Sequence, residues 1–130
     1  MLAAAVLAAE EVSFLLVGSA ALWLHGEKVT VADADVVIEP GEHNIRRLRN
    51  ALEGIAVGPW ASPNSFLSES VVPVMTAYGK VDCLLERGRR DWAQLCRGAG
   101  FLSVANVPVL VAASADVWDL RRQFKECGDE

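Results

Sequence analysis

One uncharged run, Val12 to Val17, constrains the fold of this chain more than any other feature. Its composition favours a buried strand, and it ends abruptly at Gly18 and Ser19. Residues 2–11, rich in Ala and Leu, predict a helix before the strand. Residues 20–25 resume a helical composition and stop at Gly26, a residue type that commonly ends helices. The chain therefore begins with the order helix, strand, short helix.

The rest of the chain mixes strand and helix patterns. Further strands are predicted at residues 33–39, 71–78, 81–85, near 104 and at 107–111. A clear amphipathic helix is predicted at 43–55, and two more at 91–99 and 115–126, capped by Asp91 and Ser114. Residues 58–65 are rich in turn-forming types and predict a loop, and Gly79 with Lys80 predicts a hairpin turn.

Length and composition limit the class of protein. A chain of 130 residues with 52% hydrophobic content can bury one core, and since it shows no repeat or linker we expect a single domain over residues 1–130. The net charge of −5 argues against nucleic-acid binding through a broad basic surface. A polyanionic substrate would need metal ions to offset this acidity.

The cellular location is predicted from cysteines and apolar segments. The three cysteines, Cys83, Cys96 and Cys127, follow no metal-ligand spacing, so we expect free thiols and a reducing, cytoplasmic compartment. Residues 2–9 lack the basic start of a signal peptide, and no apolar run reaches the length of a membrane span. We therefore expect a protein without a membrane segment, in which helix 2–9 could pair with a second copy.

Three acids are candidate metal ligands. Side chains two residues apart on a strand project to one face, so Asp33 and Asp35 would present neighbouring carboxylates, whose repulsion a divalent cation relieves. A pair of solvent-facing acids at a strand edge is the alternative. Asp82 lies within the otherwise apolar 81–85 strand, where a charge needs a partner.

Gly18 and Ser19 form the second candidate feature. They follow a buried strand and begin a helix, where free backbone amides and a small hydroxyl can receive a phosphate. An ordinary tight turn is the alternative interpretation.

These motifs resemble those of the nucleotidyltransferase superfamily with the DNA polymerase β-like fold. The similarity lies in the segments Gly18 to Gly26, Asp33 to Ile38, Asn44 to Leu48 and Gly79 to Leu84. The chain resembles the small bacterial single-domain members of this superfamily most. The resemblance implies an α/β fold of the α+β type, with a central mixed sheet flanked by helices.

The resemblance also implies a chemistry. Asp33, Asp35 and Asp82 would be the catalytic carboxylates and hold two Mg²⁺ ions against a nucleoside triphosphate such as ATP. Gly18, Ser19 and Lys28 would contact its phosphates. The expected reaction transfers a nucleoside monophosphate to a hydroxyl of a small molecule, RNA or protein.

Two alternatives stay open. A non-catalytic module of the same fold, such as a toxin–antitoxin component that binds a partner protein, is the second hypothesis. Arg87, Arg89 and Arg90 could meet a triphosphate or an RNA acceptor, but a solvated loop is the simpler interpretation. His25 could contact a phosphate, or it could satisfy backbone groups at a helix end.

Overall fold

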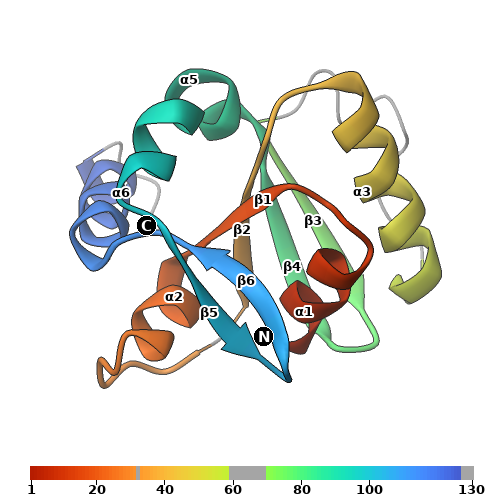
Figure 1. Ribbon diagram of the computed structural model, residues 1–130, viewed down its shortest axis with the longest axis horizontal. Helices are drawn as coiled ribbons and strands as arrows, with labels where there is room; N and C mark the ends of the chain where they lie inside the picture. The colour runs from red at the N-terminus through yellow and green to blue at the C-terminus, as the bar shows by residue number, and fades with distance from the viewer. Residues whose placement is uncertain (32, 59–69, 127–130) are drawn as a thin grey trace.

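A six-stranded mixed β-sheet forms the centre of the molecule (Figure 1). The computed structural model describes residues 1–31, 33–58 and 70–126. The strands, in chain order, are β1 (Phe14–Val17), β2 (Ala34–Ile38), β3 (Val71–Thr76), β4 (Gly79–Leu84), β5 (Gly100–Val104) and β6 (Val107–Val111). They lie in the order β3-β4-β2-β1-β6-β5, so the expected central mixed sheet is confirmed.

Helices cover both faces of this sheet. They are α1 (Leu2–Ala9), α2 (Gly18–Leu24), α3 (Glu42–Ile55), α5 (Leu85–Arg97) and α6 (Ser114–Glu126). In Figure 1, α1 and α3 lie on one side of the central strands, and α5 and α6 lie on the other. The α/β class of the α+β type follows from this arrangement. None of the described helices is long and apolar enough to cross a membrane.

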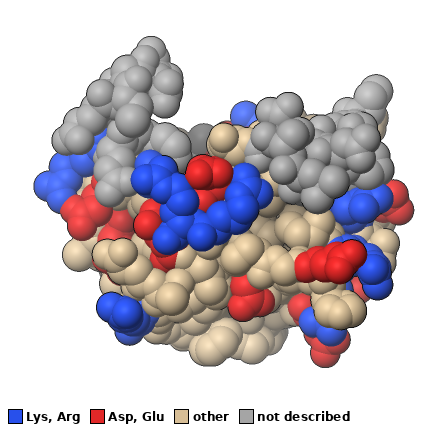
Figure 2. Space-filling model, turned by 90° about the horizontal axis from the view of Figure 1, so that it is seen from above, with Lys and Arg blue, Asp and Glu red and all other residues tan. Residues whose placement is uncertain are grey.

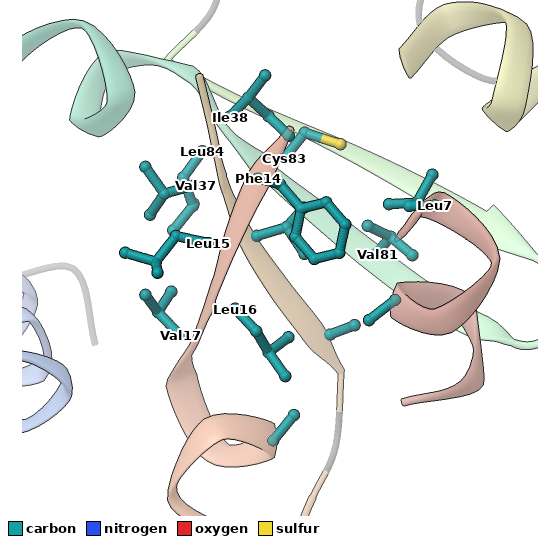
Figure 3. Packing of buried hydrophobic residues seen from close by; sticks show 14 of the residues in the cluster. Leu7, Phe14, Leu15, Leu16, Val17, Val37, Ile38, Val81, Cys83 and Leu84 are labelled. Atoms are coloured by element: carbon teal, nitrogen blue, oxygen red, sulfur yellow. The ribbon is translucent and has the colours of Figure 1, made fainter. Parts of the chain in front are cut away.

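The register of the central strands brings the acidic positions together. β1 runs antiparallel to β2 with Val17 opposite Asp35, and β2 runs parallel to β4 with Asp35 opposite Asp82. All of β1 is buried, because both of its faces are covered (Figure 3). Figure 3 shows Leu15, Val17 and Val37 on one face of the strands, with Phe14 and Val81 on the other. The predicted buried strand is therefore the centre of the core.

A buried asparagine fixes the start of α3. The side-chain amide of Asn44 donates to the carbonyls of Ser13 and Glu39 at 2.8 and 2.9 Å, and its Oδ1 accepts from the Ser13 amide at 2.7 Å. Asn44 therefore joins the segment that enters β1 to the segment that leaves β2. Polar atoms buried in this way need such partners, and no described buried side-chain N or O atom lacks one.

Two predicted boundaries were wrong. Gly79 and Lys80 belong to β4, where Gly79 pairs with Thr76, and the hairpin turns instead at Ala77 and Tyr78. The Thr76 hydroxyl stabilises this turn, since it donates to the Gly79 carbonyl and accepts from the Tyr78 amide. A local turn can use residues other than Gly when a side chain supplies its hydrogen bonds.

The second wrong boundary is the start of α5, which begins at Leu85 rather than at Asp91. Asp91 lies inside the helix and pairs with Arg87 across one turn at 3.6 Å. The sequence favoured a solvated loop for the basic residues that follow Asp82. Gly88 allows α5 to pack closely against β2, because a β-carbon at this position would overlap the backbone carbonyl of Ile38. A glycine in a helix interior costs stability unless close packing requires it.

The cysteines of the described region are free thiols, as expected. Cys83 is buried on β4, and burial raises the pKa of its thiol to about 12, so it stays protonated and unreactive. Cys96 is partly exposed on α5. Cys127 lies outside the described residues, as does the predicted 58–65 loop beyond Gly58.

Candidate active site

Asp35 and Asp82 lie side by side on adjacent parallel strands. Their Cα atoms are register partners of β2 and β4, and Asp82 lies close enough to Asp35 for its charge and a side-chain hydrogen bond to raise the pKa of Asp35. Asp33 lies one residue before β2, close enough for its charge to act on Asp35. The structure therefore brings together, on one face of the sheet, the three acids singled out from the sequence.

Lys80 completes this cluster. Its Nζ lies 3.8 Å from Asp33 Oδ2 and 3.6 Å from Asp82 Oδ1. Sequence reasoning assigned Lys80 to the hairpin turn and missed this role. The available signal was its spacing, because a residue two positions before Asp82 on the same strand shares its face.

The electrostatics of the cluster centre on Asp35. Burial, the charge of Asp82, the hydrogen bond to Asp82 and the charge of Asp33 raise the pKa of Asp35 to about 7, against a partial lowering by Lys80. Two carboxyl groups share a hydrogen bond only if one of them carries a proton. Asp35 therefore exchanges a proton near neutral pH, which is unusual for an aspartate.

The donor chemistry of this pair suits a hard divalent cation. Asp35 and Asp82 offer carboxylate oxygens, the ligands that Mg²⁺ prefers, and a cation between them would relieve the repulsion that raises the pKa of Asp35. Within the described ranges, no three Asp, Glu, His or Cys side chains are arranged to hold one metal ion as they stand. Asp33 is held at the rim by Lys80 instead.

Gly18 packs directly against the cluster. Its φ of +70° lies in the left-handed region, and a β-carbon placed on it would overlap Asp35 Oδ2 and lie 3.0 Å from Asp35 Cγ. Only glycine satisfies both conditions. Gly18 and Ser19 are the first two residues of α2, so they begin a helix as expected.

A cavity of about 400 Å³ opens beside these residues. Its polar lining is formed by Gly18, Ser19, Asp35, Asp82 and Arg121, and its apolar wall by Val17, Val71, Leu84, Val117 and Leu120. The guanidinium of Arg121 lies 5.3 Å from the ring centre of Trp118, which orients it. The cavity thus combines an acidic corner, one cation and an apolar wall.

Sequence reasoning missed the contribution of α6 to this cavity. Val117, Leu120 and Arg121 lie on consecutive turns of that helix, at a spacing that places them on one side. The spacing indicated a helix face, but not that the face closes a cavity.

Lys28 is separated from this cavity. It lines another hollow at the protein surface, together with Trp23, Gly26 and Thr30. His25, at the end of α2, bonds through Nε2 to the Ala112 carbonyl at 2.8 Å. This contact corresponds to the alternative in which His25 satisfies a backbone group, and it joins α2 to the end of β6.

The arginines that follow Asp82 lie on α5, not in the loop that we expected. Arg87 pairs with Asp91 at 3.6 Å, and Arg89 pairs with Glu86 at 3.1 Å. None of the three arginines 87, 89 and 90 lines the cavity beside Asp35 and Asp82. They are therefore placed away from a ligand bound there.

Comparison with solved structures identifies the fold. The chain is similar to a candidate nucleotidyltransferase from Thermotoga maritima, with a TM-score of 0.67 and 16% identity, over 98% of this chain and 83% of that one. A candidate nucleotidyltransferase from H. pylori matches at a TM-score of 0.47 and 14% identity, over 89% of this chain and 52% of that one. No protein-family model and no curated protein matches the chain. At this level of identity the first likeness establishes a nucleotidyltransferase fold.

Proposed function

We propose that this chain, with its nucleotidyltransferase fold, is a metal-dependent nucleotidyltransferase. It moves a nucleoside monophosphate from a nucleoside triphosphate to a hydroxyl of a small molecule, RNA or protein. One observation carries the proposal: Asp35 and Asp82 lie in register at the corner of a cavity, with Gly18 packed against Asp35. One fold can serve many different reactions, so the arrangement of this site supports the function more than the fold does.

The carboxylates hold the metal in this proposal. Asp35 and Asp82, joined by Asp33, would bind two Mg²⁺ ions. When bound, Mg²⁺ offsets the charge of the triphosphate and lowers the pKa of the acceptor hydroxyl. Lys80, which now neutralises Asp33 and Asp82 in part, holds these side chains toward the site.

The proton of the acceptor hydroxyl must leave during the transfer. Without metal, Asp35 has a pKa of about 7 because of burial and the neighbouring Asp82. A bound Mg²⁺ would lower this pKa and leave both carboxylates ionised, and Asp82 would then hold the metal or accept the proton of the hydroxyl.

The rest of the cavity positions the nucleotide. Gly18 lets the backbone at the start of α2 lie directly against Asp35, and Ser19 offers a hydroxyl and a backbone amide to a phosphate. Arg121 supplies a positive charge to the lining. Val71, which is 40% exposed, gives the cavity an apolar surface of the kind that receives a base. Because Lys28 lines a separate hollow, the proposal assigns it no phosphate contact.

Calorimetric titration tests this proposal. A non-hydrolysable nucleoside triphosphate with Mg²⁺ is titrated into the wild type, the Asp35→Asn/Asp82→Asn double variant, and an Asp119→Asn control. Asp119 is exposed on α6 and pairs only locally with Arg122. We expect Mg²⁺-dependent binding in the wild type and the control, and its loss in the double variant. Absence of such binding in the wild type at millimolar nucleotide would refute the proposal.

The second candidate function is a non-catalytic module that binds a partner protein, as in a toxin–antitoxin pair. It is favoured by strand β5, which lies at one edge of the sheet and exposes 69% of Phe101. Exposed apolar side chains on an edge strand are suited to strand addition by a partner. Nucleotide transfer that depends on Asp35 and Asp82 would decide for the enzyme.

A further inference from the structure

A second cavity, of about 590 Å³, lies between α3 and α5 at the end of β2. Figure 1 shows these two helices on either side of the upper end of the sheet, and Figure 2 looks onto this end. Its apolar lining consists of Ile38, Pro40, Ile45 and Leu85, and its charged lining of Glu42, Arg46, Arg49 and Arg89. The cavity shares no lining residue with the one beside the acids.

The charge at this cavity opposes that of the whole chain. The protein carries a net charge of −5, yet the lining holds three arginines and one glutamate. Figure 2 shows Lys and Arg side chains gathered on this end of the molecule. Arg89 is partly neutralised by Glu86, 3.1 Å away. Arg46 and Arg49 form no ion pair with any residue in the described ranges, so their charge is free to meet a ligand.

The sequence already placed these arginines on the amphipathic helix that became α3. Arg46 and Arg49 are three residues apart, so they project from one side of the helix, beside Ile45. Arg47 points elsewhere and lines a different hollow with Val6 and Glu10. The structure therefore separates two arginines that face a cavity from one that does not.

We propose that this cavity binds a nucleoside monophosphate unit, with the phosphate at Arg46 and Arg49 and the base against Pro40 and Ile45. A guanidinium matches a phosphate through two parallel hydrogen bonds and can also stack on a planar base. The apolar floor suits a base, and the volume lies in the range of small-molecule sites, about 300–1,000 Å³. The occupant is either a free nucleotide or one unit of an RNA strand.

The proposed site differs from the acidic cavity in one chemical requirement. Asp35 and Asp82 repel a phosphate unless a cation intervenes, whereas Arg46 and Arg49 attract it directly. Ile38 is three residues beyond Asp35 on β2, about 10 Å along the strand. Binding at Arg46 and Arg49 therefore proceeds without divalent metal and does not depend on the transferase reaction proposed above.

Equilibrium binding of AMP in the presence of EDTA tests the inference. Wild type, Arg46→Ser/Arg49→Ser, Arg49→Lys and an Arg47→Ser control are each titrated with AMP, adenosine and inorganic phosphate. We expect wild type to bind AMP at least tenfold more tightly than adenosine or phosphate alone. The double variant should lose about tenfold or more, since each charge-assisted contact is strong, and Arg47→Ser should bind as wild type.

The conservative variant keeps the test decisive if the double variant does not fold. Arg49→Lys retains the charge but not the paired hydrogen bonds, so its affinity for AMP should fall severalfold while its unfolding temperature stays unchanged. No AMP binding in EDTA, or equal affinity in wild type and both cavity variants, would overturn the inference. Equal affinity for inorganic phosphate and AMP would do the same, because it would indicate an unspecific anion site.

Two further arms locate the ligand and its source. Asp35→Asn/Asp82→Asn should bind AMP in EDTA as wild type does, and loss of binding there would place AMP in the acidic cavity and overturn the inference. That result leaves the proposed transferase activity untouched. A 5′-phosphorylated oligoribonucleotide that binds more tightly than AMP identifies RNA as the source, and equal affinity identifies a free nucleotide; both support the site.

Discussion

Gly18 lies so close to Asp35 that a β-carbon at position 18 would overlap the carboxylate oxygen Oδ2. Gly18 also has a φ of +70°, which other residues adopt at a cost of about 1–2 kcal/mol. We therefore expect Gly18→Ala to lower the free energy of unfolding by about 2 kcal/mol or more and to weaken Mg²⁺-dependent nucleotide binding at least tenfold. Chemical denaturation and calorimetry measure the two effects.

Gly54→Ala is the matched control for that variant. Gly54 lies inside α3, and a β-carbon there would meet nothing within 4 Å. Because alanine favours a helix more than glycine does, this variant should gain up to about 1 kcal/mol. If Gly18→Ala were as stable as Gly54→Ala, the close packing of Gly18 against Asp35 would be wrong.

The raised pKa of Asp35 predicts a pH dependence of stability in the absence of metal. Asp35 binds its proton more tightly in the folded chain, with a pKa of about 7, than in the unfolded chain, with 3.8. Protonation therefore favours folding, and the free energy of unfolding should fall as pH rises from about 4 to 7 and level off above 7. One proton limits the slope to less than about 1.4 kcal/mol per pH unit. Urea denaturation in EDTA at several pH values measures it.

Asp35→Asn isolates this contribution, since the other titrating groups remain. The free energy of unfolding of the variant, relative to that of the wild type, should increase between pH 4 and 7. Mg²⁺ should reduce the loss of wild-type stability over this range, because a cation replaces the proton between Asp35 and Asp82. A difference that stays constant across this pH range would contradict the assignment.

Gly88 of α5 provides a test of the packing between that helix and β2. A β-carbon on Gly88 would overlap the Ile38 carbonyl, which is backbone and cannot rotate away. We expect Gly88→Ala to lower the free energy of unfolding by about 2–3 kcal/mol. Because Ile38 and Leu85 line the cavity that contains Arg46 and Arg49, AMP binding in EDTA should weaken as well. An unchanged denaturation midpoint would show that α5 does not pack this closely.

Asn44 provides a test of the link between α3 and the sheet. Asn44→Ala removes three hydrogen bonds and leaves the Ser13 amide and the Ser13 and Glu39 carbonyls without this partner. Loss of such buried partners should cost about 3 kcal/mol. The exposed Asn50→Ala on the same helix should change stability by less than about 0.5 kcal/mol. Thermal denaturation compares the two variants. Equal unfolding temperatures would contradict the structural role assigned to Asn44.

The sequence by itself determined the elements whose signal is local. The run of uncharged residues at β1 and the β-forming composition of β3, β4 and β6 predict strands, and the apolar period of α3 predicts a helix. The alternation of side chains along a strand indicated that Asp33 and Asp35 share a face. Local patterns specify which side of a strand or helix is apolar, and they predict a chain of mixed strands and helices. The resemblance to a known superfamily, in turn, implied the α/β fold with its central mixed sheet.

Only the tertiary structure decided which distant residues meet. The register of β2 against β4 sets Asp35 beside Asp82, and it results from the packing of whole strands rather than from either sequence segment. The close contact between Gly88 of α5 and Ile38 of β2 cannot be read from either sequence segment alone. The contact of Lys80 with Asp33 and the place of Arg121 beside Asp35 likewise join residues that are far apart in the sequence. The periodicity of apolar residues predicts to which side of a strand or helix a side chain points. Which residues from distant segments lie close together is decided only when the core packs.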